Sequence, residues 1–208
     1  MKKIGQGLQH EVFEYGSDRV IKYPRTMLSL LKDDFSKNPL LVFNFKKILR
    51  IMNNYKSLNE LRSLSRAIVS RNVNLGLLGN PIFEGDKIIQ DKVEVLSEVF
   101  GKGEEKDRIL IDRYIESIYE TWQSGFSDRV YNLLSNSGLN KNDKVVLLDF
   151  GEITFNKSDV ENDIKQQKWK EASNFKKDLP KSIKGYYQEK MSKELTLQKL
   201  DTYWKSSA

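Results

Sequence analysis

Two short β-hairpins constrain the fold of this chain more than any other feature of its sequence. Residues 12–15 and 19–23 are two runs of strand length, and the turn sequence Gly16-Ser17-Asp18 lies between them. A second hairpin is predicted over 75–96, where Gly85-Asp86 separates two apolar runs. The two hairpins together predict an antiparallel sheet in the first half of the chain.

Helical periodicity fills the sequence between the hairpins. Apolar residues recur at helical spacing over 27–52, where Pro39 separates two halves, and again over 57–69. Ser57 and Glu60 form a capping-box pattern at the start of the second of these helices. Strands and helices in this order predict a mixed α+β fold.

A Gly- and Glu-rich segment, 99–106, is the best candidate for a linker. It divides the chain into an N-terminal lobe, residues 1–98, which carries the sheet, and a mostly helical C-terminal lobe, residues 99–208. The second lobe is predicted to contain a helix at 107–123, a turn at Ser124-Gly125, a buried strand at 144–150, and basic helices from 158 onward, interrupted at Pro180 and Gly185.

The composition excludes several classes of chemistry. The 208 residues include no cysteine, so disulfides and thiolate metal sites are excluded. His10 is the only histidine, which excludes sites with several histidines and disfavours a Ser-His-Asp triad. The remaining chemistry must use carboxylates, lysines, amides or a bound ion. The net charge of +6 is spread along the chain and favours anionic ligands.

The sequence does not have the features of a membrane-spanning or secreted protein. Its longest apolar stretches are far shorter than the roughly 18 residues of a spanning helix. The N-terminal residues begin with two lysines but lack the apolar core of a signal peptide. We therefore expect a cytoplasmic protein.

The first chemical motif combines glycines with a lysine on a strand. Gly5 and Gly7 precede Val12, and the returning strand carries Lys22 after Val20 and Ile21. Glycines let backbone amides approach phosphate oxygens because no Cβ is in the way, and a lysine can neutralise those oxygens. A plain hairpin is the alternative, because hairpins often carry glycines.

The second motif lies in residues 145–152. A strand of four apolar residues there ends in Asp149-Phe150-Gly151-Glu152. A carboxylate at the end of a strand suits a hard cation such as Mg²⁺, whose octahedron phosphate oxygens can complete. The alternative is an aspartate that ends a strand before a glycine turn, which is common in any fold.

In this order the motifs resemble the glycine-rich loop, the strand lysine and the D-F-G segment of protein kinases. The resemblance covers residues 4–156 and fits small, divergent bacterial kinase-like proteins better than eukaryotic protein kinases. It implies a minimal two-lobed protein-kinase-like fold that binds ATP and Mg²⁺ in a cleft between the lobes. The nucleotide-contacting residues that it implies are Gly5, Gly7, Val12 and Lys22, and Asp149 is its metal ligand.

The resemblance implies further site residues between these motifs. Glu60 matches the helix glutamate that pairs with the strand lysine, although a capping or solvated glutamate is an equal alternative. Asp91 and Val93 match the strand that leads to the hinge, where a backbone carbonyl and an amide bind adenine. Asn132, followed by two leucines, matches the catalytic-loop asparagine that holds metal.

The H-R-D motif of the kinase catalytic loop is absent. Counting back from Asn132, its histidine position is Gly125 and its aspartate position is Ser127. Asp128 lies one residue further on, and we predict that a shortened loop lets it replace the missing catalytic aspartate.

A capping role is the alternative for this loop. Ser127 or Asp128 could cap a helix that begins near Arg129, which is a common use of both residue types. Hydrogen bonds to Asp128 from the amides of Val130 or Tyr131 would indicate this role and would favour an inactive protein.

Three functions remain open from the sequence. The first is an ATP/Mg²⁺-dependent phosphotransferase whose acceptor, a protein or a small molecule, the sequence does not identify. The second is a catalytically inactive kinase-like protein that binds nucleotide or a partner. The third is a nucleic-acid-binding module, which the sequence disfavours because aromatic residues at such spacings usually belong to a core. The aromatic residues in question are Trp169, Tyr186, Tyr187 and Trp204.

Overall fold

The structure is a computed structural model that describes residues 1–6, 10–26, 63–149, 151–171 and 181–205. The chain divides into two compact units, Met1–Asn72 with Pro81–Lys92 and Val73–Asn80 with Val93–Ala208. The described residues form several helices and a five-stranded antiparallel sheet, which confirms the predicted α+β class. Within these residues, no helix is both long enough and apolar enough to span a bilayer.

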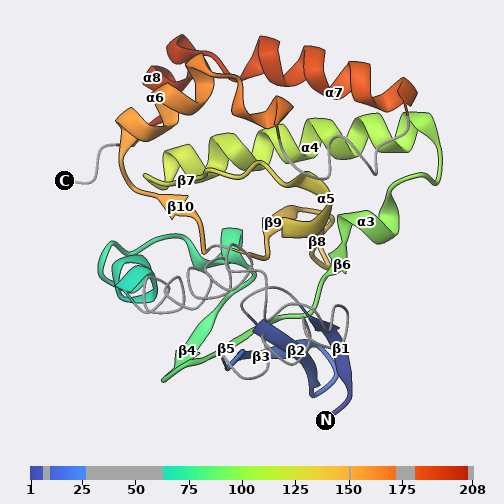
Figure 1. The fold of residues 1–208 in the computed structure, drawn as a ribbon, viewed down its shortest axis with the longest axis vertical. Helices are drawn as coiled ribbons and strands as arrows, with labels where there is room; N and C mark the ends of the chain where they lie inside the picture. Colours follow the sequence, from blue (N-terminus) through green and yellow to red (C-terminus); the bar gives the residue numbers. More distant parts are fainter. Residues whose placement is uncertain (7–9, 27–62, 150, 172–180, 206–208) are drawn as a thin grey trace, which may run out of the picture. The chain divides into compact units, whose positions relative to one another are not determined.

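The first unit contains the five-stranded sheet, with strand order β1-β2-β3-β5-β4 (Figure 1). The strands are β1 (Lys3–Gln6), β2 (His10–Tyr15), β3 (Arg19–Pro24), β4 (Ile82–Glu84) and β5 (Lys87–Asp91). The hairpin β2-β3 confirms the first predicted hairpin, and Gly16 in its turn has φ +71°, which costs little without a Cβ. Strand β1 is an addition to the predicted strands.

The second predicted hairpin is confirmed only in part. Strands β4 and β5 flank the turn at Gly85-Asp86 as predicted. The residues before them form a 3₁₀ helix, η2 (Leu75–Leu78), and not a strand. The side chain of Asn74 accepts a hydrogen bond from the amide of Gly76 at 3.1 Å, and Gly79 ends the helix with φ +66°. Local capping therefore overrides the apolar run.

The helical segment before this hairpin is described only at its end. Residues 63–70 are helical, which confirms the described part of the helix predicted at 57–69. The helix predicted at 27–52 and the capping pair Ser57 and Glu60 lie outside the described residues.

The second unit is built around the long helix α4 (Glu104–Gln123), which confirms the helix predicted at 107–123. Helices α7 (Lys181–Glu194) and α8 (Leu197–Tyr203) pack against it, and Figure 1 shows α7 running along α4. The buried face of α4 consists of Leu110, Ile111, Tyr114, Ile115, Ile118, Thr121 and Trp122, together with Asp107. The acidic side chains in its first turn interact favourably with the positive, N-terminal end of the helix dipole.

The C-terminal helices place their aromatic residues in this core. Trp169 and Tyr187 are each 1% exposed, while Tyr186 and Trp204 are partly buried against the core. Their positions support the core assignment over a nucleic-acid-binding surface.

Gly185 does not interrupt the helix, contrary to the prediction. It lies inside α7, where Ile183, Tyr187 and Met191 are buried on one face. A glycine in a helix costs only about 1 kcal/mol relative to alanine, and burial of these three side chains outweighs that cost.

Two small sheets complete the second unit, and they determine the positions of its polar residues. Strand β7 (Ser127–Asp128) pairs with β10 (Ile153–Thr154), and β8 (Ser137–Leu139) lies between β6 (Glu94–Val95) and β9 (Val145–Leu147). Strand β9 is fully buried and confirms the central part of the strand predicted at 144–150. The remaining short helices are α3 (Leu96–Val99), α5 (Leu133–Asn136), α6 (Lys157–Lys165) and η3 (Lys168–Lys170).

Candidate functional site

Three of the predicted nucleotide-contacting residues lie in one row across the sheet of the first unit. Gly5 of β1 is directly opposite Val12 of β2, and Val12 is directly opposite Lys22 of β3. Directly opposed residues of an antiparallel pair point to the same face of the sheet. Lys22, which is partly buried, and Val12 therefore share a face on which Gly5 adds no side chain.

The other predicted residues of this group are less informative. Gly7 and Glu60 lie outside the described residues, and so does the predicted ion pair between Lys22 and Glu60. Asp91 ends β5 opposite Arg19, and an oxygen of its carboxylate lies 3.5 Å from the Arg19 guanidinium. Val93 follows two residues later, in the segment between β5 and β6, and is partly buried.

In the second unit, strand pairing brings the segment after Asp149 against Asp128. Asp128 is directly opposite Ile153 in the β7-β10 pair, and the amide of Arg129 donates to the carbonyl of Glu152 at 3.3 Å. Asp149 itself follows β9 by two residues and is exposed. Its carboxylate accepts a hydrogen bond from the amide of Gly151 at 3.2 Å.

The carboxylate of Asp128 holds the backbone of its own loop. Its Oδ1 accepts a hydrogen bond from the amide of Val130 at 3.2 Å, and its Oδ2 accepts one from the amide of Tyr131 at 3.0 Å. These are the hydrogen bonds that the capping alternative predicts, and they favour an inactive protein over a catalytic role for Asp128. The helix expected near Arg129 is absent, however, because residues 129–132 are described as non-helical and α5 begins only at Leu133. Asp128 therefore anchors a bend and caps no helix.

The environment of Asp128 changes its proton affinity. Removal of the partly buried carboxyl group from water is the main cause that raises the pKa of Asp128, the two amide hydrogen bonds lower it, and the negative charges of Asp149 and Glu152 raise it; the net result is a pKa of about 7. Asp128 is therefore near enough to both Asp149 and Glu152 for their charges to act on it. A carboxyl group with a pKa near 7 can exchange a proton at neutral pH, as a general base must.

Ser127 occupies the aspartate position of the kinase loop by count, and its role in the structure is internal. The side chain is buried, and its hydroxyl group accepts a hydrogen bond from Nε1 of Trp122 at 3.2 Å. The same hydroxyl group donates to the carbonyl of Asp128 at 3.1 Å. Ser127 thus secures the loop to α4 and the core.

An ionic network that the sequence analysis did not identify holds the other side of the loop. Arg129 donates two hydrogen bonds to Asp163 of α6, which is almost fully buried, and the hydrogen bond to Asp163 raises the pKa of Arg129. Lys168 also contacts Asp163, at 2.9 Å. The sequence gives only a weak indication of this network, because sequence patterns do not distinguish a buried aspartate on a helix from a solvated one.

Asn132 lies at the end of the loop that Asp128 begins. It directly precedes α5, but its side chain makes no capping hydrogen bond. Its Oδ1 is buried and has no hydrogen-bond partner among the described residues. A buried amide oxygen without a donor is costly unless a cation or water satisfies it, so the residue fits a hard ion such as Mg²⁺.

The described carboxylates do not by themselves form a metal cage. Among the described residues, no group of three or more His, Cys, Asp or Glu side chains could hold an ion. Mg²⁺ at nucleotide sites commonly uses one or two carboxylates, and phosphates and waters supply the other ligands. Asp149 and Asn132 are therefore compatible with Mg²⁺ that arrives with a nucleotide.

Comparison with known proteins adds no family to this geometry: no protein-family model matches the chain, and no curated protein matches it.

Proposed function

We propose that this chain is an ATP/Mg²⁺-dependent phosphotransferase of the protein-kinase-like superfamily. The proposal depends mainly on one observation in the second unit, the proximity of Asp128 to the segment that carries Asp149 and Glu152. In kinases, the catalytic-loop aspartate and the D-F-G aspartate act on the same phosphoryl group. The charge interactions of Asp128 with Asp149 and with Glu152 are compatible with such an arrangement.

The sheet of the first unit supports the same proposal. Kinases carry the ATP-binding lysine on the third strand, and Lys22 lies on β3. Gly5 and Val12 share its row across the sheet. Under this proposal the first unit corresponds to the small sheet lobe of a kinase, and the second corresponds to the helical lobe.

Each residue then has a distinct role. Lys22 and the amides near Gly5 and Gly7 orient the phosphates, and Asp149 and Asn132 hold Mg²⁺. Asp128 positions the acceptor hydroxyl group. A loose phosphoryl-transfer transition state needs little early proton removal, so orientation is the main contribution of such an aspartate.

The first experiment measures nucleotide binding. Thermal unfolding is followed with ATP and Mg²⁺, with ATP and EDTA, and with AMP and Mg²⁺ as a control. We expect the largest increase in Tm with ATP and Mg²⁺, because a ligand that binds only the folded state stabilises it. Absence of any increase with ATP and Mg²⁺ would refute nucleotide binding.

A second candidate function is a catalytically inactive, nucleotide-binding protein. The observation that favours it is the use of both Asp128 oxygens by the amides of Val130 and Tyr131, together with the missing H-R-D motif. Loss of the γ-phosphoryl group from ATP, measured with and without a panel of hydroxyl acceptors, separates the two functions. Binding without transfer supports the inactive protein, and Mg²⁺-dependent transfer that exceeds the uncatalysed rate supports the enzyme.

A further inference from the structure

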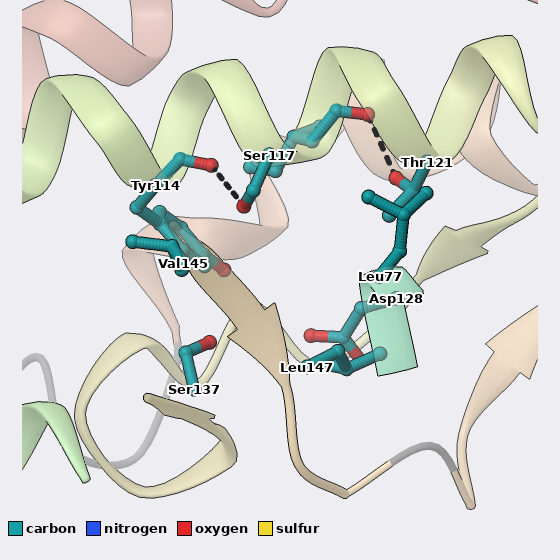
Figure 2. A pocket seen from close by; sticks show the side chains of 9 residues that line it. Leu77, Tyr114, Ser117, Thr121, Asp128, Ser137, Val145 and Leu147 are labelled. Carbon is teal, nitrogen blue, oxygen red and sulfur yellow. Dashed lines mark hydrogen bonds between the residues drawn. The ribbon is translucent and has the colours of Figure 1, made fainter. Parts of the chain in front are cut away.

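A small cavity lies inside the second unit beside α4. Its volume is about 20 Å³. A cavity needs roughly 10–15 Å³ measured in this way to hold one water molecule, so this cavity has room for one and not for a larger ligand. The lining residues are Leu77, Tyr114, Ser117, Ile118, Thr121, Asp128, Ser137, Val145 and Leu147, and Figure 2 shows most of them.

The wall of the cavity carries several polar side chains. Asp128 and Ser137 both line the cavity, and Figure 2 shows the carboxyl group of the first and the hydroxyl group of the second. Ser137 is only 2% exposed, and Tyr114, which also lines the cavity, is 4% exposed, so bulk water does not solvate either residue.

The other two hydroxyl groups of the wall are already used. Ser117 donates to the carbonyl of Tyr114 at 2.7 Å, and Thr121 donates to the carbonyl of Ile118 at 2.7 Å. Figure 2 marks both bonds. The groups that face the cavity for a new interaction are therefore those of Asp128, Ser137 and Tyr114.

We propose that this cavity is a binding site for one structural water molecule, which bridges the carboxyl group of Asp128 to the hydroxyl group of Ser137. The water donates one hydrogen bond to Asp128 and accepts one from Ser137, with Tyr114 as a third partner. Two to four polar partners are what a buried water requires. The site does not depend on nucleotide binding, so it stands or falls separately from the proposed function.

The bridging water is compatible with the hydrogen bonds that Asp128 already accepts. An ionised carboxylate offers about four lone-pair positions, and the amides of Val130 and Tyr131 occupy two of them. The water occupies a third position on the buried side. One position then remains for an acceptor hydroxyl group or solvent.

The bridge also changes the charge of Asp128. Among the described residues, the ionisable groups that interact with it include Asp149 and Glu152 from the segment next to β10, Tyr131 from its own loop, Tyr114 from α4 and Tyr187 from α7. All five of these groups are acidic. A water that donates to the charged form lowers the pKa of Asp128 from what burial alone would give.

The test is an NMR titration of the Asp128 carboxyl carbon, assigned by its loss in Asp128→Asn. We compare the parent with Ser137→Ala and with the matched control Ser117→Ala, whose hydroxyl group lines the same cavity but bonds to a backbone carbonyl. Ser137→Ala is expected to raise the pKa of Asp128 by roughly half a pH unit or more, because the water loses its hydrogen bond from Ser137 and binds the carboxylate less well. Ser117→Ala is expected to leave it near the parental value.

Two results overturn the proposal. One is an unchanged or lowered pKa of Asp128 in Ser137→Ala. The other is an equal shift of this pKa in Ser137→Ala and Ser117→Ala, which would mean that any change in the shape of the cavity produces the shift. If Ser137→Ala does not fold, a high-resolution crystal structure of the parent decides the question. Density for a water within about 2.6–3.2 Å of both Asp128 and Ser137 supports the site, and a cavity without such density excludes it.

Discussion

The guanidinium group of Arg129 binds both carboxylate oxygens of Asp163, with hydrogen bonds of 3.0 Å from Nε and from Nη2. The side chain of Asp163 is 2% exposed, whereas those of Arg129 and Lys168 are 36% and 33% exposed. This pair connects the residue after Asp128 to helix α6. Asp163 therefore holds one side of the loop, whose backbone Asp128 and Ser127 also hold.

We predict that Asp163→Ala lowers the free energy of unfolding by about 2–4 kcal/mol. Breaking a buried pair usually costs about 3–5 kcal/mol, but the two cations left behind can reach water and reduce the loss. Urea denaturation measures the change. The control is Asp201→Ala, which removes an exposed ion pair with Lys157 and should cost at most about 1 kcal/mol. Equal small losses in the two variants would show that the network does not hold the loop.

The raised pKa of Asp128 predicts a dependence of stability on pH. Its pKa is about 7 in the folded protein and its ordinary value is 3.8. The folded state therefore binds more protons than the unfolded state between these values. The free energy of unfolding falls as the pH rises through this window and levels off above about pH 7.

Asp128→Asn removes this titration. Relative to the variant, the parent is expected to lose up to about 1.4 kcal/mol of unfolding free energy per pH unit within the window. Urea denaturation of both proteins from about pH 5 to about pH 8 measures the difference, and other titrating groups cancel between them. Parallel curves for the parent and the variant would mean that Asp128 titrates at its ordinary pKa.

The proposed metal site predicts a selective loss in Asp149→Ala. Asp149 is exposed and follows β9 by two residues, so the variant should keep its fold while Mg²⁺ no longer increases stabilisation by ATP. In the parent, ATP at 100 times its Kd should stabilise by about 2.7 kcal/mol. Asp143→Asn is the control, because Asp143 is also exposed and asparagine tolerates its φ of +58°. Asp149 is not a metal ligand if its variant binds ATP with Mg²⁺ as well as the parent does.

A catalytic role for Asp128 predicts that Asp128→Asn separates turnover from binding. Loss of an orienting base typically costs about 10²–10⁴-fold in rate, whereas stabilisation by ATP with Mg²⁺ should change little. Single-turnover transfer and thermal unfolding measure the two effects. A variant that loses binding and turnover equally would mean that Asp128 only stabilises the loop. The catalytically inactive protein would then be the preferred function.

Local sequence patterns predicted the elements that local interactions form. The β2-β3 hairpin follows from a turn sequence between two runs of strand length, and α4 follows from its apolar stripe. Val12 and Lys22 share a row because the β2-β3 pairing follows from the same turn. Gly5 joins that row only through β1, a strand that the sequence did not predict.

The elements that the sequence did not predict depend on contacts between distant residues. Strands β7 and β10 have two residues each, too few for a periodic pattern, and only their pairing brings the Asp149–Glu152 segment against Asp128. Gly185 lies within a helix because its neighbours are buried, which no local signal indicates.

By itself, the sequence determined the α+β class, the main hairpin, helix α4, and the residue types available for phosphate and metal binding. Only the tertiary structure decided that Ser127 is internal, that Asp128 holds two amides and has a raised pKa, and that Asp163 binds Arg129. The physical reason is that turn and helix preferences act over a few residues. Burial and charge interactions depend instead on which distant side chains the packed core brings together.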